Sequence, residues 1–228
     1  MSSNSPITVT LIGRGRIGSE VADGLRALPE YRLVAVLGRD ADDLPPAQLT
    51  IDAAGPNALR EHGAQALQNG DLWTAGAVAL ADPAMRTKLE GMARDNDHEL
   101  RLFTAWIAGP ALCPPDVPAR LFIRQSAPQL ADEPGLIFRG KLADAVRRYP
   151  DILNAATAAA ITGPGIEATR VTLVSTSDGG PHRITARFEM PGQTIRTDVR
   201  FDQLTPHPVA AAILTALARR TNPIRMGP

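Results

Sequence analysis

Three glycines near the N-terminus have the spacing of a phosphate-binding loop. They form the pattern Gly-x-Gly-x-x-Gly within residues 7–18, where an apolar strand-like run leads into the loop and a helix-like segment follows from Glu20. In such a loop the first glycine allows a tight turn, the second lets the backbone approach a pyrophosphate, and the third lets the helix pack on the strand. The N–H groups that open the helix then point at the phosphates. The pattern therefore predicts a dinucleotide site built from Gly13, Gly15, Arg16, Ile17 and Gly18. The alternative is that the glycines only make a tight turn in an ordinary βαβ unit.

The end of the next predicted strand, residues 32–37, bears on which nicotinamide cofactor would fit. An NAD site usually places Asp or Glu about 20 residues beyond the glycines to bind the ribose 2′-hydroxyl, whereas an NADP site offers Arg to the 2′-phosphate. Here Gly38 and Arg39 follow the strand. The sequence therefore predicts NADP or NAD as cofactor, with NADP slightly favoured by Arg39. Asp40 would favour NAD if the register shifted by two residues, and Arg39 could instead be a solvated loop charge.

Strand and helix signals alternate through the first part of the chain. Strands joined by helices of this length form a parallel sheet with right-handed crossovers. We therefore predict an α/β fold in which residues 1–106 form a Rossmann domain with a doubly wound parallel sheet. Its further elements are expected as strands over 49–54 and 101–107, a strand or strand leading into a loop over 73–80, and helices over 57–69 and from Asp82-Pro83 onward.

The pattern changes after residue 106, where strands follow one another with fewer helices between them. Alternation in the last three strands places one face on a core and the other, rich in Thr and Arg, outward. We predict an α+β domain with a mixed or antiparallel sheet over residues 107–205, and a C-terminal helix within 206–228 that packs back on the first domain. The expected strands are 121–125, 135–140, 170–176, 182–190 and 194–201, and the expected helices are 151–161 and 207–220.

Composition points to a small-molecule partner. Lys plus Arg and Asp plus Glu number 24 each, so no charge excess favours nucleic acid or a membrane surface. The single cysteine, Cys113, rules out an intrachain disulfide and suits a reducing cytoplasm. The sequence has no signal-peptide pattern and no run of about 18 apolar residues. We expect a cytoplasmic protein that binds neither nucleic acid nor membrane.

Five segments occur in the order found in L-aspartate dehydrogenases, and the chain resembles a divergent member of that family. The resemblance covers nearly the whole chain and rests on residues 13–18, 52–62, 79–83, 149–156 and 178–182. It implies an NAD(P)-dependent oxidoreductase that converts aspartate to iminosuccinate, or runs the reductive amination of oxaloacetate. It also implies a homodimer.

The resemblance assigns candidate roles to several side chains. His182 matches the family's catalytic histidine, which could accept the proton released as hydride departs. Asn154 matches an asparagine at the nicotinamide end of the cofactor, and Ala54 and Gly55 follow the third strand at the edge where ligands bind in doubly wound sheets. The loop beside nicotinamide and substrate corresponds to residues 104–109 and includes Thr104 as a substrate contact and Trp106 as a cofactor contact. His207 falls where the family has Lys or Arg at the substrate, and no metal site is expected.

Two departures from the family pattern keep other functions open. Trp106 replaces a small residue, and His207 with Pro208 replaces a charged donor. A bulky aromatic with fewer charged donors suggests a less acidic or more apolar substrate than aspartate. The alternatives are a family member that reduces another imine or oxo substrate in a specialised pathway, and a nucleotide-binding protein without turnover.

Overall fold

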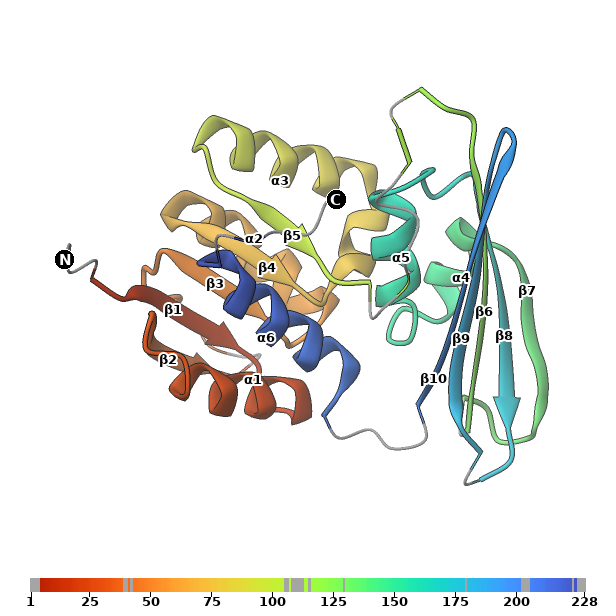
Figure 1. The fold of residues 1–228 in the computed structure, drawn as a ribbon, viewed down its shortest axis with the longest axis horizontal. Coiled ribbons are helices and arrows are strands. Elements are labelled where there is room, and N and C mark those ends of the chain that lie inside the picture. Colours follow the sequence, from red (N-terminus) through yellow and green to blue (C-terminus); the bar gives the residue numbers. More distant parts are fainter. Residues whose placement is uncertain are drawn as a thin grey trace. The chain divides into compact units, whose positions relative to one another are not determined.

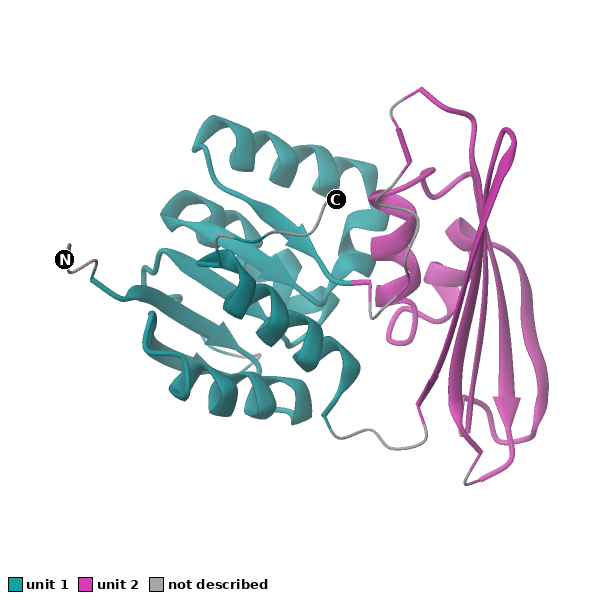
Figure 2. Cartoon of the chain, in the orientation of Figure 1, with its two compact units in different colours: residues 1–103, 206–227 teal, residues 104–205, 228 magenta. Residues whose placement is uncertain are grey.

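The computed structural model describes residues 5–38, 41, 43–104, 107, 113–114, 116–128, 130–178, 180–201, 206–222 and 224. The chain divides into two compact units (Figure 2). The first comprises residues 1–103 and 206–227, and the second comprises residues 104–205. Arg39 and Trp106, two of the predicted cofactor contacts, lie outside the described residues.

The first unit is built on a parallel sheet of five strands in the order β2-β1-β3-β4-β5 (Figure 1). Its strands are β1 (Ile7–Ile12), β2 (Tyr31–Leu37), β3 (Leu49–Asp52), β4 (Asp71–Thr74) and β5 (Leu100–Leu102), and its helices are α1 (Arg16–Arg26), α2 (Pro56–Asn69), η1 (Ala77–Ala81), α3 (Pro83–Asp95) and α6 (Pro208–Arg220). The strand order reverses between β1 and β3, so the crossovers place α1 and α2 on opposite faces. The predicted doubly wound parallel sheet is confirmed.

The C-terminal helix α6 completes the core on the face covered by α1. Apolar side chains of α1 and α6 form one buried cluster with residues of β1 to β4, including the fully buried Trp73. Gly24 of α1 faces the side chain of Leu214, and a Cβ there would come within 2.4 Å of a Leu214 methyl group. The Tyr31 hydroxyl donates to the Leu217 carbonyl over 2.9 Å. Residues at the two ends of the chain therefore share one core.

A buried carboxylate ties the ends of β3 and β4 together. Asp52 is 1% exposed and accepts hydrogen bonds from the Ala54 N–H at 2.8 Å and the Thr74 hydroxyl at 2.6 Å. The Thr74 hydroxyl oxygen in turn accepts from the Gly76 N–H at 2.8 Å. Burial raises the pKa of Asp52 to about 6, although the hydrogen bonds from Thr74, Ala54 and Gly55 oppose the shift. This network fixes the two loops that leave the carboxyl edge of the sheet.

The second unit is a mixed sheet of five strands in the order β10-β9-β6-β8-β7, with helices on one face (Figure 1). Only β6 and β8 are parallel neighbours, and the other three pairings are antiparallel. The strands are β6 (Arg120–Pro128), β7 (Gly135–Lys141), β8 (Thr169–Thr176), β9 (His182–Met190) and β10 (Gln193–Phe201), and the helices are α4 (Leu142–Arg148) and α5 (Asn154–Ile161). Alternate strand residues such as Leu121, Ile123 and Ile184 are buried, as expected for a sheet covered on one side.

Several predicted boundaries were wrong. Helix α4 was not predicted, because its seven residues span too few turns to show a clear apolar period. The helix predicted from Asp151 begins at Asn154, since residues 150–152 form a turn. The strand predicted over 101–107 ends at Leu102. For residues 73–80, where we predicted a strand or a strand leading into a loop, the second alternative holds: β4 ends at Thr74, and a 3-10 helix begins at Ala77.

Within the part of the chain that the structure describes, no helix combines the length and apolar character that a membrane crossing requires.

Because Asp52 is buried, we expect the free energy of unfolding of the protein to decrease as pH rises. Its folded-state pKa of about 6 lies above the unfolded value of about 3.9, so the folded state holds the proton more tightly. The stabilisation is complete below about pH 4 and is lost as pH rises to about 6, by up to about 3 kcal/mol. Urea unfolding at a series of pH values between 4 and 7 measures this change. The free energy of unfolding of Asp52→Asn should not fall over this range.

Asp82→Asn is the matched control. Asp82 caps α3 by accepting from the Ala84 N–H, and Asn caps about as well. This variant should follow the wild-type pH dependence. Parallel pH profiles for wild type and Asp52→Asn would contradict the assignment to Asp52.

Candidate functional site

The predicted phosphate loop occupies the reversal point of the first sheet. Gly13 has φ of +119°, and a Cβ on it would lie 2.9 Å from the Ala53 carbonyl carbon. A Cβ on Gly18 would lie 2.0 Å from the Gly13 carbonyl oxygen. These two glycines are therefore required by the fold, because α1 and the loop after β3 both press against the turn after β1. Ligands of doubly wound sheets bind at this reversal point.

Gly15 differs from its two neighbours in the pattern. It is the N-cap of α1, and a Cβ built on it would meet no atom within 4 Å. The cap makes no side-chain hydrogen bond, and the first turn of α1 contains no acidic residue. The first N–H groups of a helix have no acceptor within the helix, and they carry the positive end of its dipole. The open space at Gly15 therefore suits an anionic group such as a pyrophosphate.

Two arginines flank this helix start. Arg16 pairs with Glu20 one turn along α1, at 3.4 Å. Arg14 reaches the carboxyl end of β2, where its Nη2 donates to the Val36 carbonyl over 3.1 Å. The sequence reasoning missed Arg14, although it occupies a variable position of the glycine pattern itself. Its guanidinium lies at the strand end where a dinucleotide fold binds the adenosine ribose.

The predicted contacts Ala54 and Gly55 lie at the same edge of the sheet. The Ala54 N–H is held by Asp52, and Gly55 is the N-cap of α2 with φ of +96°. A Cβ on Gly76 would lie 2.7 Å from the Gly55 carbonyl carbon. The loops after β3 and β4 are thus packed backbone to backbone. Asp52, which organises them, opens a segment used for the family resemblance, but its burial was not predicted.

His182, the predicted catalytic residue, begins β9 in the second unit. Its ring meets Phe201 of β10 edge to face, with centroids 5.4 Å apart, and its Nε2 lies 3.4 Å from Nε2 of the buried Gln125. An amide N–H only donates, so in this arrangement Nε2 accepts and the ring proton is on Nδ1. Burial lowers the pKa of His182 below its ordinary value. The imidazole is therefore neutral at pH 7 and able to accept a proton.

The other predicted residues of the second unit are Asn154 and Thr104. Asn154 is the first residue of α5 and is partly buried. The Thr104 hydroxyl donates to the Ile107 carbonyl over 3.1 Å, which fixes the chain beyond β5. Their roles at cofactor and substrate stay predictions.

His207 has a structural role in the first unit. Its Nδ1 accepts from the Val209 N–H at 3.2 Å and caps α6, while its backbone N–H donates to Glu20 at 2.6 Å. These contacts tie the start of α6 to α1. The predicted contact of His207 with substrate stays a prediction. Among the described residues, no group of three or more His, Cys, Asp or Glu side chains could hold a metal ion.

Comparison with known proteins places this geometry in a family. A family model described as aspartate dehydrogenase, C-terminal, matches residues 118–221. L-aspartate dehydrogenase 2 of Bordetella pertussis is 30% identical over 261 aligned residues, covering 93% of this chain and 98% of that protein. L-aspartate dehydrogenase of Cupriavidus necator is 29% identical, covering 90% of this chain and 96% of that protein.

The fold agrees with these relatives. The crystal structure of aspartate dehydrogenase from Thermotoga maritima aligns with a TM-score of 0.81 at 18% identity, covering 98% of this chain and 100% of that one. The resemblance inferred from the order of the sequence segments is confirmed. The chain belongs to the L-aspartate dehydrogenase family, a family of NAD(P)-dependent oxidoreductases that act on CH–NH₂ groups.

Proposed function

We propose that this protein exchanges a hydride between a nicotinamide dinucleotide and L-aspartate, giving iminosuccinate, or catalyses the reverse reaction from oxaloacetate and ammonia. Relatives named L-aspartate dehydrogenase, at up to 30% identity, support the substrate. The observation that carries the proposal is the open N-terminus of α1 at Gly15. By the same family resemblance, we propose a cytoplasmic homodimer.

The residues present fit the cofactor. Gly13 and Gly18 allow the tight turn before α1, Gly15 leaves open space at the N-cap of α1, and Ala54 and Gly55 lie at the same sheet edge. When bound, the nicotinamide ring supplies the hydride acceptor or donor. We propose NADP as the preferred cofactor, because two cations, Arg14 and Arg39, lie at or follow the end of β2. A guanidinium can bind a 2′-phosphate in a bidentate manner.

We propose His182 as the acid–base residue. In its neutral form it would take the proton that the substrate nitrogen or an attacking water loses as hydride leaves the substrate carbon. Gln125 would be a positioning residue that keeps the ring in one orientation. Asn154 would hold the carboxamide of the cofactor, and Thr104, Trp106 and His207 would contribute to binding of cofactor and substrate. A panel of amino acids tests the substrate, and a better substrate than aspartate would favour the alternative of another imine or oxo acid.

Gly15→Val should weaken cofactor binding without unfolding the protein. The new side chain enters space that no protein atom occupies within 4 Å of Cβ, and the φ of −75° at this residue is compatible with any side chain. NADPH affinity, measured by fluorescence titration, should fall at least tenfold, a loss of about 1.4 kcal/mol, with little change in melting temperature. Gly91→Val is the control, because Gly91 is also open within 4 Å but lies on α3. Unchanged NADPH binding by Gly15→Val would overturn the phosphate site.

His182→Ala should lower kcat by a factor of about 100 or more, the usual contribution of a general base, while NADPH binding is kept. His98→Ala, whose ring bonds the Leu67 carbonyl, should leave kcat close to that of the wild type. Since burial lowers the pKa of His182, kcat/KM in the oxidative direction should decline only below the pH range of an ordinary histidine. Equal kcat in both variants would show that His182 is structural.

Arg14→Ala and Arg39→Ala should each raise KM for NADPH by about tenfold or more, the usual effect of removing a hydrogen bond to a charged group. KM for NADH should change little, because NADH lacks the 2′-phosphate. Steady-state kinetics with both cofactors measure this difference. If both cofactors lost affinity equally, the two arginines would not select NADP.

A further inference from the structure

The loops after β3 and β4 are joined into a ring of contacts around one carboxylate. Asp52 accepts from the Ala54 N–H through Oδ1 at 2.8 Å and from the Thr74 hydroxyl through Oδ2 at 2.6 Å. The Thr74 oxygen accepts from the Gly76 N–H at 2.8 Å. The ring closes where a Cβ on Gly76 would lie 2.7 Å from the Gly55 carbonyl carbon. A single buried side chain therefore holds the backbone of both loops.

This ring also touches the phosphate loop that follows β1. A Cβ on Gly13 would lie 2.9 Å from the Ala53 carbonyl carbon and 3.1 Å from the Ala54 nitrogen. The Ala54 nitrogen is the one that donates to Asp52. Because backbone lies directly against backbone here, a shift of residues 53–55 would change the surface that a dinucleotide meets at the reversal point of the sheet.

The hydrogen bonds of the ring suit the ionised form of the carboxylate. An ionised carboxylate only accepts hydrogen bonds, and each oxygen of Asp52 already has a donor. A proton on Oδ1 would oppose the Ala54 N–H. A proton on Oδ2 would oppose the Thr74 hydroxyl, which would have to turn away and lose its bond to the carboxylate. Protonation of Asp52 therefore breaks one link of the ring.

The surroundings of Asp52 contain one titratable side chain that acts on it. Its neighbours in register are Ile12 on β1 and Thr74 on β4, which carry no charge. Burial raises the pKa of Asp52 to about 6, and the charge of His62 on α2 opposes this shift. Among the described residues, His62 is the only titratable group whose charge affects Asp52 in this way. Asp52 therefore changes its charge in a pH range that binding experiments can cover.

His62 is buried without a hydrogen-bond partner at one ring nitrogen. It belongs to the buried face of α2 and is 4% exposed. Within the described part of the chain, no group bonds its Nε2, and the Glu61 Oε2 at 3.9 Å is beyond hydrogen-bonding distance. A buried polar atom left in this way costs free energy and calls for an explanation. The electrostatic action of His62 on Asp52 supplies one.

We propose that Asp52 is a positioning residue for the cofactor, and that its ionised carboxylate holds the loops after β3 and β4 in the shape that binds the dinucleotide. Asp52 acts through the backbone of Ala54 and Gly55 and does not itself touch the cofactor. His62 favours the ionised form and so favours binding. The inference rests on the proposed function, because it takes residues 53–55 as part of the dinucleotide site. Cofactor affinity should therefore rise with pH as Asp52 loses its proton.

The test measures the dissociation constant of NAD by calorimetric titration between pH 5 and pH 8. NAD lacks the 2′-phosphate, so the ligand has no group that gains a proton near pH 6. Wild-type affinity should fall about fivefold or more between pH 7.5 and pH 5. Asp52→Asn should bind NAD about tenfold more weakly at pH 7.5, and its affinity should vary less than about twofold over this pH range.

His62→Gln tests the proposal with Asp52 in place, and it also serves if Asp52→Asn fails to fold. Because the charge of His62 lowers the pKa of Asp52, its removal should shift the midpoint of the affinity profile to higher pH. Affinity at pH 8 should stay within about twofold of the wild type. His98→Gln is the matched control, since His98 is a partly buried histidine of the same unit that bonds the Leu67 carbonyl. Its profile should match that of the wild type.

Two results would overturn the inference alone. One is equal NAD affinity of wild type and Asp52→Asn at every pH. The other is wild-type affinity that increases as pH falls, which would show that the carboxylate repels the diphosphate. Absence of dinucleotide binding by the wild type would contradict the proposed function and the inference together. A wild type that binds NAD with the expected pH profile but oxidises no amino acid would contradict only the proposed function.

Discussion

The first unit depends on one constraint, which is the close approach of backbone to backbone at the carboxyl edge of its sheet. Cβ atoms would lie 2.0 Å from the Gly13 oxygen if placed on Gly18, and 2.7 Å from the Gly55 carbonyl carbon if placed on Gly76. Only glycine allows these contacts, which bring the loops after β1, β3 and β4 together. The Asp52 carboxylate then joins β3 to β4 through Thr74. Gly15 is the exception, since no protein atom requires a glycine there, and the space that it leaves is where the diphosphate is proposed to bind.

The features that the sequence predicted are those encoded over short distances. The glycine spacing, the strand–helix alternation and the Asp82-Pro83 helix start all depend on neighbouring residues, and the structure contains the corresponding elements. Helix α4 and the early end of β5 were not predicted. A seven-residue helix and a three-residue edge strand are held by packing rather than by a periodic pattern of their own.

The chemistry of individual side chains could not be predicted from the sequence, because it depends on partners that are distant along the chain. His182 could be chosen by resemblance, but its lowered pKa comes from burial in a sheet where Gln125 and Phe201 belong to other strands. The Asp52 carboxylate accepts a hydrogen bond from Thr74, which lies 22 residues further along the chain. Neither the burial of Asp52 nor its raised pKa therefore follows from the local sequence. In both units, burial created by the pairing of strands far apart in the chain shifts the pKa of a titratable group.

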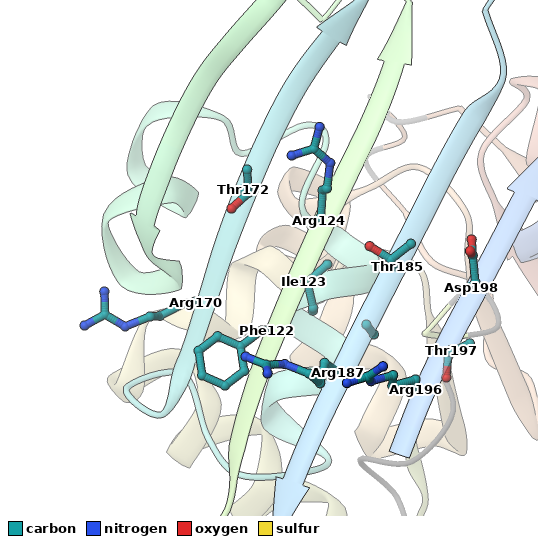
Figure 3. A pocket seen from close by; sticks show the side chains of 11 residues that line it. Phe122, Ile123, Arg124, Arg170, Thr172, Thr185, Arg187, Arg196, Thr197 and Asp198 are labelled. Atoms are coloured by element: carbon teal, nitrogen blue, oxygen red, sulfur yellow. The ribbon is translucent and has the colours of Figure 1, made fainter. Parts of the chain in front are cut away.

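The balance of 24 cationic and 24 anionic residues describes the whole chain and does not describe its surfaces. Because side chains alternate along β6, β8, β9 and β10, arginines gather on one face of the sheet (Figure 3). The net charge of the whole sequence does not reflect this alternation. A chain without net charge can therefore still carry a locally cationic face.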